Sequence, residues 1–185
     1  MRSPCFEIKP MYQRILVPID GSPTASRGLD EAVELARLSG GSIRLLHVLD
    51  QFTFLTGLEI GSTYAPDVLS LLREGGEWIL GEGKARVAAA GVAFDTLLLE
   101  GIAVRTAAVV VRQAQEWPAD LIVIGSHGRR GVRRLMLGSD AEQIVRTATV
   151  PVLLVHADET AAGETGHADA QSAADAEAGK TTTAA

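Results

Sequence analysis

The sequence contains little cysteine, few aromatic residues and no long apolar run. Cys5 is its single cysteine, which excludes an internal disulfide framework and favours a reducing compartment. Aromatic residues make up 4% of the chain, so the core has to consist of aliphatic side chains, as in a parallel sheet that helices cover on both faces. No apolar run approaches the roughly 18 residues of a membrane-spanning helix, and residues 1–11 lack the continuous apolar stretch of a signal peptide. We therefore expect a cytoplasmic protein that does not engage a membrane.

The chain also lacks the excess of basic residues that would indicate a nucleic-acid partner. Its formal net charge is −6, and residues 157–185 account for −5 of it, with six acidic residues against one lysine. These residues include no Leu, Ile, Val or aromatic side chain, so they cannot bury enough apolar surface to offset the entropy of ordering. We predict a loose arm over residues 1–11, one domain over residues 12–156 and a disordered acidic tail over residues 157–185.

Within the predicted domain, short apolar runs alternate with segments of helical periodicity. The runs predict strands at residues 14–19, 42–48, 92–99, 121–124 and 151–155. This alternation predicts an α/β fold with an open, mostly parallel five-stranded sheet and helices on both faces. One of the helices, at about residues 67–90, contains Gly75, Gly76, Gly81 and Gly83. Each glycine costs about 1 kcal/mol relative to alanine, so we expect this helix to be bent or broken.

A glycine-rich segment follows the fourth predicted strand and runs from Gly125 to Ser139. Glycines let a ligand approach the backbone, and successive amide groups in such a loop form a concavity that binds anions. Gly138 and Ser139 precede the last predicted helix, whose first-turn amides and dipole also favour negative charge. The chain has neither the G-x-x-x-x-G-K-[ST] motif nor a G-x-G-x-x-G after the first strand. The segment therefore predicts a phosphate site of a different design, made of a loop and a helix N-terminus.

The spacing of Gly125, Gly128, Gly138 and Ser139 resembles the G-2x-G-9x-G-[S/T] signature of ATP-binding universal stress proteins. The sequences at residues 15–22, 119–128 and 151–155 also resemble that family's first, fourth and fifth strands with their loops. The resemblance covers residues 13–156. It implies a sheet of strand order 3-2-1-4-5 and a homodimer in which the last strands, from Pro151 to Val155, meet.

The resemblance implies a role for individual residues in binding ATP, with Mg²⁺ as the accompanying ion. The adenosine would lie against the loop after the first strand and the end of the second strand, at Pro18, Ile19, Asp20 and, through its backbone, Val48. The phosphates would be bound by the glycine segment, at Gly125, Gly128, Gly138 and Ser139, with His127 and Arg129 near enough in sequence to assist. Asp20 has a simpler interpretation as well, in which it only supports the turn with Gly21 and Ser22.

Asp140 departs from the family pattern, because relatives usually carry a neutral residue directly after the serine. A carboxylate in the first turn suits the helix dipole, and this is the role that we expect. If it faced the phosphates it would repel them, or it would help to hold Mg²⁺. The basic group nearby, made of Arg129, Arg130, Arg133 and Arg134, either compensates the triphosphate or is a solvated face. No aromatic platform accompanies it, so RNA binding is not expected.

His47 lies within an apolar run, and we expect a core histidine with its hydrogen bonds satisfied. Cys5, His127 and His156 are too scattered in the sequence to indicate a zinc site, and no spacing is diagnostic of nucleophilic catalysis. We therefore predict no catalytic residue and no metal ligand.

The predicted function is that of an ATP-binding stress regulator, whose nucleotide occupancy biases its interaction with a protein partner. Two alternatives stay open: a slow ATPase or transferase of nucleotide phosphates, and an interaction module that binds no nucleotide.

Overall fold

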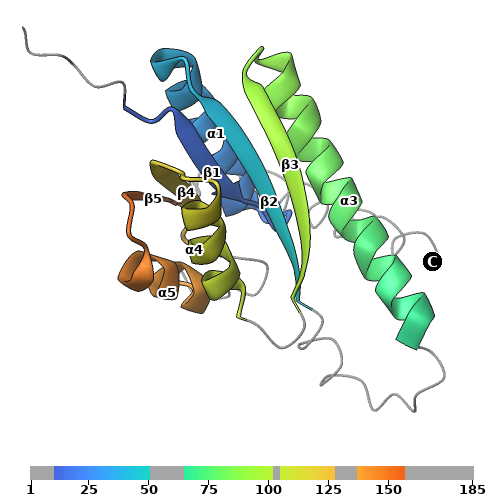
Figure 1. The fold of residues 1–185 in the computed structure, drawn as a ribbon. Coiled ribbons are helices and arrows are strands. Elements are labelled where there is room, and N and C mark those ends of the chain that lie inside the picture. The colour runs from blue at the N-terminus through green and yellow to red at the C-terminus, as the bar shows by residue number, and fades with distance from the viewer. Residues whose placement is uncertain (1–10, 51–64, 102–104, 128–136, 157–185) are drawn as a thin grey trace, which may run out of the picture.

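A computed structural model describes residues 11–50, 65–101, 105–127 and 137–156. Strands and helices alternate along these residues (Figure 1) as β1 (Arg14–Pro18), α1 (Pro23–Ser39), β2 (Ser42–Asp50), α3 (Ala65–Ala89), β3 (Ala93–Gly101), α4 (Thr106–Glu116), β4 (Leu121–Gly125), α5 (Ser139–Thr147) and β5 (Val152–Val155). The predicted elements are confirmed, and their ends differ by one or two residues. The predicted acidic tail and, apart from Met11, the predicted arm lie outside the described residues.

The five strands form one parallel sheet in the order β3-β2-β1-β4-β5, as the family resemblance implied. Helices α1 and α3 pack on one face of the sheet, and α4 and α5 pack on the other (Figure 1). The chain runs outward from β1 through β2 to β3, and then crosses back to β4 on the other side of β1. The strand order therefore reverses between β1 and β4, which is where ligands bind to open parallel sheets.

Aliphatic side chains fill both layers of the core. The strand β1 shows the alternation, because Ile15 and Val17 pack with α1 and α3, whereas Leu16 packs with the residues of α4 and α5. All three side chains are fully buried. A sheet that is covered on both faces needs apolar residues at successive positions, which explains the unbroken apolar runs of the sequence.

Helix α3 continues through its four glycines, so the predicted break is wrong. A Cβ on Gly76 would lie 2.9 Å from side-chain atoms of His47, Leu49 and Leu98, and a Cβ on Gly83 would lie 2.9 Å from Ile19. These two glycines let α3 lie directly on the sheet, and this packing offsets their low helix propensity. None of the helices in the described ranges is both long and apolar enough to span a membrane.

Candidate functional site

The loop between β1 and α1 carries Ile19 and Asp20, two of the residues predicted to contact adenosine, and Pro18 ends β1 directly before it. The amide of Ile19 donates to the carbonyl of Leu46 over 2.8 Å, and Oδ1 of Asp20 accepts from the amide of Ser22 over 2.9 Å. Gly21 between them has a φ of 79°, a left-handed conformation that glycine adopts without strain. The turn leads into α1, where Oγ of Ser22 accepts from the amide of Ala25 over 3.2 Å. Asp20 therefore supports the turn, as its simpler interpretation predicted. It does so in the loop after β1, where the contact with adenosine is also predicted.

Val48 lies where β2 continues past the end of β1. The ladder between the two strands ends at Pro18, opposite Leu46. Alternate residues of a strand present their backbone groups to the same neighbour, so Val48 faces the space beyond the end of β1. Its side chain is half-buried and packs with the α4 and α5 layer. The position agrees with a backbone contact to the edge of a base.

The loop after β4 joins the two predicted halves of the phosphate site. Ser126 is fully buried, and its amide donates to the carbonyl of Val155 over 2.8 Å. Its own carbonyl accepts from the amide of Gly138 over 2.9 Å. This last bond holds the start of α5 against the end of β4, although nine residues of sequence outside the described parts separate His127 from Leu137.

Gly125 has a packing role in addition to the one predicted. A Cβ on Gly125 would lie 2.8 Å from the backbone of Thr24 and of Ala25. Gly28, one helical turn further along α1, faces the backbone of β4 in return, because its own Cβ would lie 3.5 Å from the amide nitrogen of Gly125. The first turns of α1 therefore lie directly on the end of β4. Glycine is required here for the approach of a helix, and this does not depend on a ligand.

Two hydroxyl groups connect the β1 loop to the β4 loop. Oγ1 of Thr24 donates to the carbonyl of His127, and Oγ of Ser22 lies 3.5 Å from the same carbonyl and 3.2 Å from Oγ1 of Thr24. Ser22 and Thr24 are both buried. The contact crosses the point where the strand order reverses, so the predicted adenosine side and the predicted phosphate side are held together.

The amino end of α5 is not capped by any side chain of the described residues. Gly138 is the N-cap residue, and it has no side chain to bond the first-turn amides. Ser139 and Asp140 are exposed at this end, and neither side chain caps the helix. Asp140 and Glu142 place two acids in the first turn, where they complement the helix dipole. Because no described side chain caps the helix, its first-turn amides are available to an anion, although the two acids reduce the attraction.

His127 is oriented by its neighbour. Its Nδ1 lies 2.9 Å from Oγ of Ser126, and its ring makes an edge contact with the ring of His156, with 6.5 Å between the centroids. Nε2 is buried, and within the described parts of the chain it has no hydrogen-bond partner. An imidazole nitrogen in this condition is unusual, because buried polar atoms are nearly always paired.

Most of the predicted site residues lie along one edge, formed by the carboxyl ends of the strands. We call it the carboxyl edge, and it carries Pro18, Ile19, Asp20, Val48, Gly125, His127, Gly138, Ser139 and Asp140. Gly128, Arg129 and the rest of the basic group lie outside the described residues. Sequence reasoning missed Thr24 and Ser126. In the sequence, Thr24 is a hydroxyl residue two positions after an N-cap, and Ser126 is a serine directly after Gly125.

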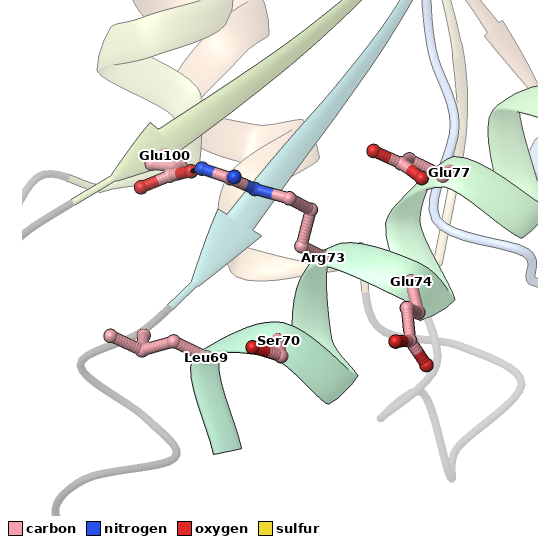
Figure 2. Close-up of a pocket in the computed structure, with 6 residues that line it drawn as sticks. All are labelled: Leu69, Ser70, Arg73, Glu74, Glu77 and Glu100. Atoms are coloured by element: carbon pink, nitrogen blue, oxygen red, sulfur yellow. Dashed lines mark hydrogen bonds and ion pairs between the residues drawn. The ribbon is translucent and has the colours of Figure 1, made fainter. Parts of the chain in front are cut away.

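A hollow of about 350 Å³ lies apart from these residues, between α3 and the end of β3 (Figure 2). It is lined by Leu69, Ser70, Arg73, Glu74, Glu77 and Glu100. Figure 2 shows the side chain of Arg73 reaching from α3 to Glu100, with which it forms an ion pair. The hydrogen bond to Glu100 raises the pKa of Arg73 above its ordinary value. Three carboxylates against one guanidinium do not suit a polyphosphate, so this hollow is not the predicted nucleotide site.

Comparisons with known proteins agree with the fold. The sequence model of the Universal stress protein family matches residues 11–156, and the chain belongs to this family. It is similar to the universal stress protein YxiE of Bacillus subtilis, with 32% identity over 150 residues that cover 78% of this chain and 99% of the relative. It is also similar to a solved member of the family from Burkholderia pseudomallei, with 35% identity, a TM-score of 0.63, and coverage of 79% of this chain and 97% of the other.

Two of the similar structures contain a nucleotide. One is a universal stress protein in complex with cAMP, at 25% identity and a TM-score of 0.56, covering 80% of this chain and 99% of the other. The other is the universal stress protein from Archaeoglobus fulgidus in complex with dAMP, at 25% identity and a TM-score of 0.56, covering 78% and 98%. Nucleotide binding therefore occurs among the structures that resemble this chain.

Proposed function

We propose that this protein binds ATP at the carboxyl edge, between β1 and β4, and acts as a nucleotide-dependent regulator. The hydrogen bond from the amide of Gly138 to the carbonyl of Ser126 carries the proposal. It holds the N-terminus of α5 beside the loop after β4, so two sets of anion-binding groups face one ligand. The relatives in complex with cAMP and dAMP support a nucleotide as that ligand.

The proposed contacts divide between the two parts of the ligand. Pro18, Ile19 and Asp20 contact the adenosine, and Val48 contacts the base through its backbone. The phosphates extend from the loop after β4 to the start of α5 and are bound at Gly125, His127, Gly128, Arg129, Gly138 and Ser139. The spacing of Gly125, Gly128, Gly138 and Ser139, which resembles the signature of the ATP-binding members of the family, favours ATP as the nucleotide.

Mg²⁺ would be bound mainly by the phosphates. In the described ranges, no group of three or more His, Cys, Asp or Glu residues could hold a metal ion. Mg²⁺ usually keeps several waters and is commonly bound by substrate phosphates, so it needs few ligands from the protein. The residues present therefore fit an ion that enters together with the nucleotide.

A regulatory role follows from retention of the nucleotide. The sequence has no Walker-type lysine to stabilise a transferring phosphoryl group, so the bound ATP would persist and stabilise one state of the carboxyl edge for a protein partner.

Titration calorimetry with Mg·ATP tests the proposal, and Gly138→Val is the matched variant, with Gly81→Ala on the exposed side of α3 as the control. We expect Gly138→Val to bind ATP at least tenfold more weakly, equivalent to about 1.4 kcal/mol. The affinity of Gly81→Ala is expected to equal that of the wild type. No binding of ATP up to millimolar concentration would contradict the proposal and favour a nucleotide-free interaction module.

The proposed regulator is a homodimer that pairs through β5. This strand lies at one end of the sheet order, and an edge strand presents unpaired backbone groups to another chain. The side chain of Leu153 on this strand is 36% exposed. Light scattering after gel filtration is expected to give a dimer for the wild type and a monomer for Leu153→Lys. Leu38→Lys, at an 85% exposed position on α1, is expected to remain a dimer.

A second function, slow hydrolysis of the bound ATP, has one observation in its favour. Nε2 of His127, which has no partner among the described residues, lies in the loop that the proposal assigns to the phosphates. Such a nitrogen could orient an attacking water. Release of ADP that survives repurification and disappears in both Gly138→Val and His127→Gln would support hydrolysis. Bound ATP without any ADP would exclude it.

A further inference from the structure

His47 is a buried polar residue that the proposed contacts do not use. It lies on β2 between Leu46 and Val48, and its side chain is 6% exposed. Nδ1 lies 2.6 Å from the carbonyl oxygen of Ile19, which confirms the prediction of a satisfied core histidine. A carbonyl oxygen only accepts hydrogen bonds, so Nδ1 is the nitrogen that carries the proton in this contact.

This hydrogen bond takes the place of the next rung in the ladder between β1 and β2. The amide of Ile19 donates to the carbonyl of Leu46 over 2.8 Å. In a regular parallel ladder, the carbonyl of Ile19 would then accept from the amide of Val48. The register ends at Pro18 opposite Leu46, and the carbonyl of Ile19 accepts from the imidazole instead.

The hydrogen bond from His47 to Ile19 changes which backbone group of Val48 is available to a ligand at the carboxyl edge. Its amide faces the side of β1, but β1 no longer supplies the acceptor. An amide donor at the carboxyl edge suits an acceptor nitrogen of a purine ring, because a backbone amide forms hydrogen bonds wherever an acceptor is in reach. The carbonyl that a regular ladder would place opposite this amide is bonded to the imidazole instead.

The packing of α3 keeps the imidazole in this orientation. A Cβ on Gly76 would lie 2.9 Å from Cδ2 of His47, so the ring fills the space beneath a glycine of α3. The ring is thus held between a helix on one side and the end of β1 on the other. A side chain in such a position has few alternative rotamers.

We infer that His47 is a positioning residue for the base: it holds the carbonyl of Ile19 and so leaves the Val48 amide to the nucleotide. The inference rests on the proposed function and deepens it, because it makes recognition of the base depend on a residue that does not touch the ligand. Removal of the imidazole donor lets the carbonyl of Ile19 accept from Val48. The ladder then gains one rung, and the base loses its donor.

Two substitutions separate positioning from a merely structural role. His47→Asn keeps a donor at the place of Nδ1, and His47→Leu removes the donor with little change in volume. The affinities for ATP and for inorganic tripolyphosphate are measured by calorimetry, and the hydrogen exchange of the Val48 amide is measured without nucleotide. Val87→Ala, in the fully buried part of α3, controls for a general loss of stability.

We expect ATP to bind to His47→Leu about tenfold more weakly or worse, and tripolyphosphate to bind as it does to the wild type. Exchange at Val48 is expected to slow in His47→Leu, as a new hydrogen bond forms, and to stay unchanged in His47→Asn and Val87→Ala. Wild-type ATP affinity in His47→Leu would overturn the inference, as would an equal loss for tripolyphosphate.

If the wild type binds no nucleotide, the proposed function fails, and the exchange of the Val48 amide then decides the inference alone. Slower exchange in His47→Leu supports the inference that the imidazole replaces the hydrogen bond from the Val48 amide to the Ile19 carbonyl. Unchanged or faster exchange overturns it.

Discussion

Gly125, at the end of β4, lies so close to Ala25 in the first turn of α1 that a Cβ on the glycine would be 2.8 Å from the alanine amide nitrogen. The neighbouring atoms belong to a backbone that Ser22 caps and Pro23 starts, so they cannot move aside as a flexible side chain would. The glycine of the family signature therefore positions a helix as well as a loop.

Gly125→Ala is expected to destabilise the fold because the added methyl group meets this backbone. Overpacking of a dense interior costs about 1–3 kcal/mol, and we expect a loss in this range in the free energy of unfolding, measured with denaturant in the absence of nucleotide. A stability equal to that of the wild type would show that α1 moves away from β4 without cost.

The glycines of α3 are expected to respond in opposite directions. A Cβ on Gly75 or on Gly81 would meet no atom within 4 Å, so alanine at either position should stabilise the helix by about 0.5–1 kcal/mol. Alanine at Gly76 would meet His47, Leu49 and Leu98 at 2.9 Å, and the clash is expected to outweigh the gain in propensity. Thermal unfolding of the single variants distinguishes the two classes. Changes in stability of the same sign for Gly76→Ala and Gly81→Ala would contradict this account.

The bond from Thr24 to the carbonyl of His127 is expected to stabilise both the fold and the proposed phosphate loop. Thr24→Val keeps the shape but removes the donor from the half-buried carbonyl of His127, and the loss of such a bond costs about 1 kcal/mol. Thr24→Ser retains the hydroxyl and is the matched control. We expect Thr24→Val to lower the unfolding free energy and to weaken ATP binding, and Thr24→Ser to lie near the wild type in both. A loss in Thr24→Ser together with wild-type values in Thr24→Val would assign the effect to the methyl group instead.

The sequence was sufficient for the order of the elements because aliphatic runs, caps and breakers all indicated the same alternation. It was misleading for α3, where local propensity disfavours Gly76 and Gly83. The reason that these glycines are compatible with a helix is the proximity of His47 and Ile19, which lie on β2 and at the end of β1. Helix propensity contains no information about such distant neighbours.

The candidate site also contains features that the sequence predicted and features that it did not. Spacing along the chain predicted the glycines at the carboxyl edge, since a phosphate loop is a local feature. The contacts of Thr24 with His127 and of His47 with Ile19 join residues 103 and 28 positions apart. Neither pair forms a motif, and each becomes visible only when the strand order brings β1 beside β2 and β4.

Asp140 determines the charge at the amino end of α5, and its neutralisation is expected to favour the phosphates. The carboxylate is exposed in the first turn, where it offsets the partial positive charge that would attract an anion. Without Mg²⁺, Asp140→Asn should bind ATP a few-fold more tightly, in proportion to the roughly 0.3–1 kcal/mol of such dipole interactions, and the gain should shrink at high salt. Glu142→Gln is the control, since that acid lies in the same turn but pairs with Arg146 at 3.3 Å, and we expect a smaller change. Calorimetry with and without Mg²⁺ measures both effects. A variant that loses affinity only when Mg²⁺ is present would contradict the dipole role, because the carboxylate would then act as a ligand of the ion.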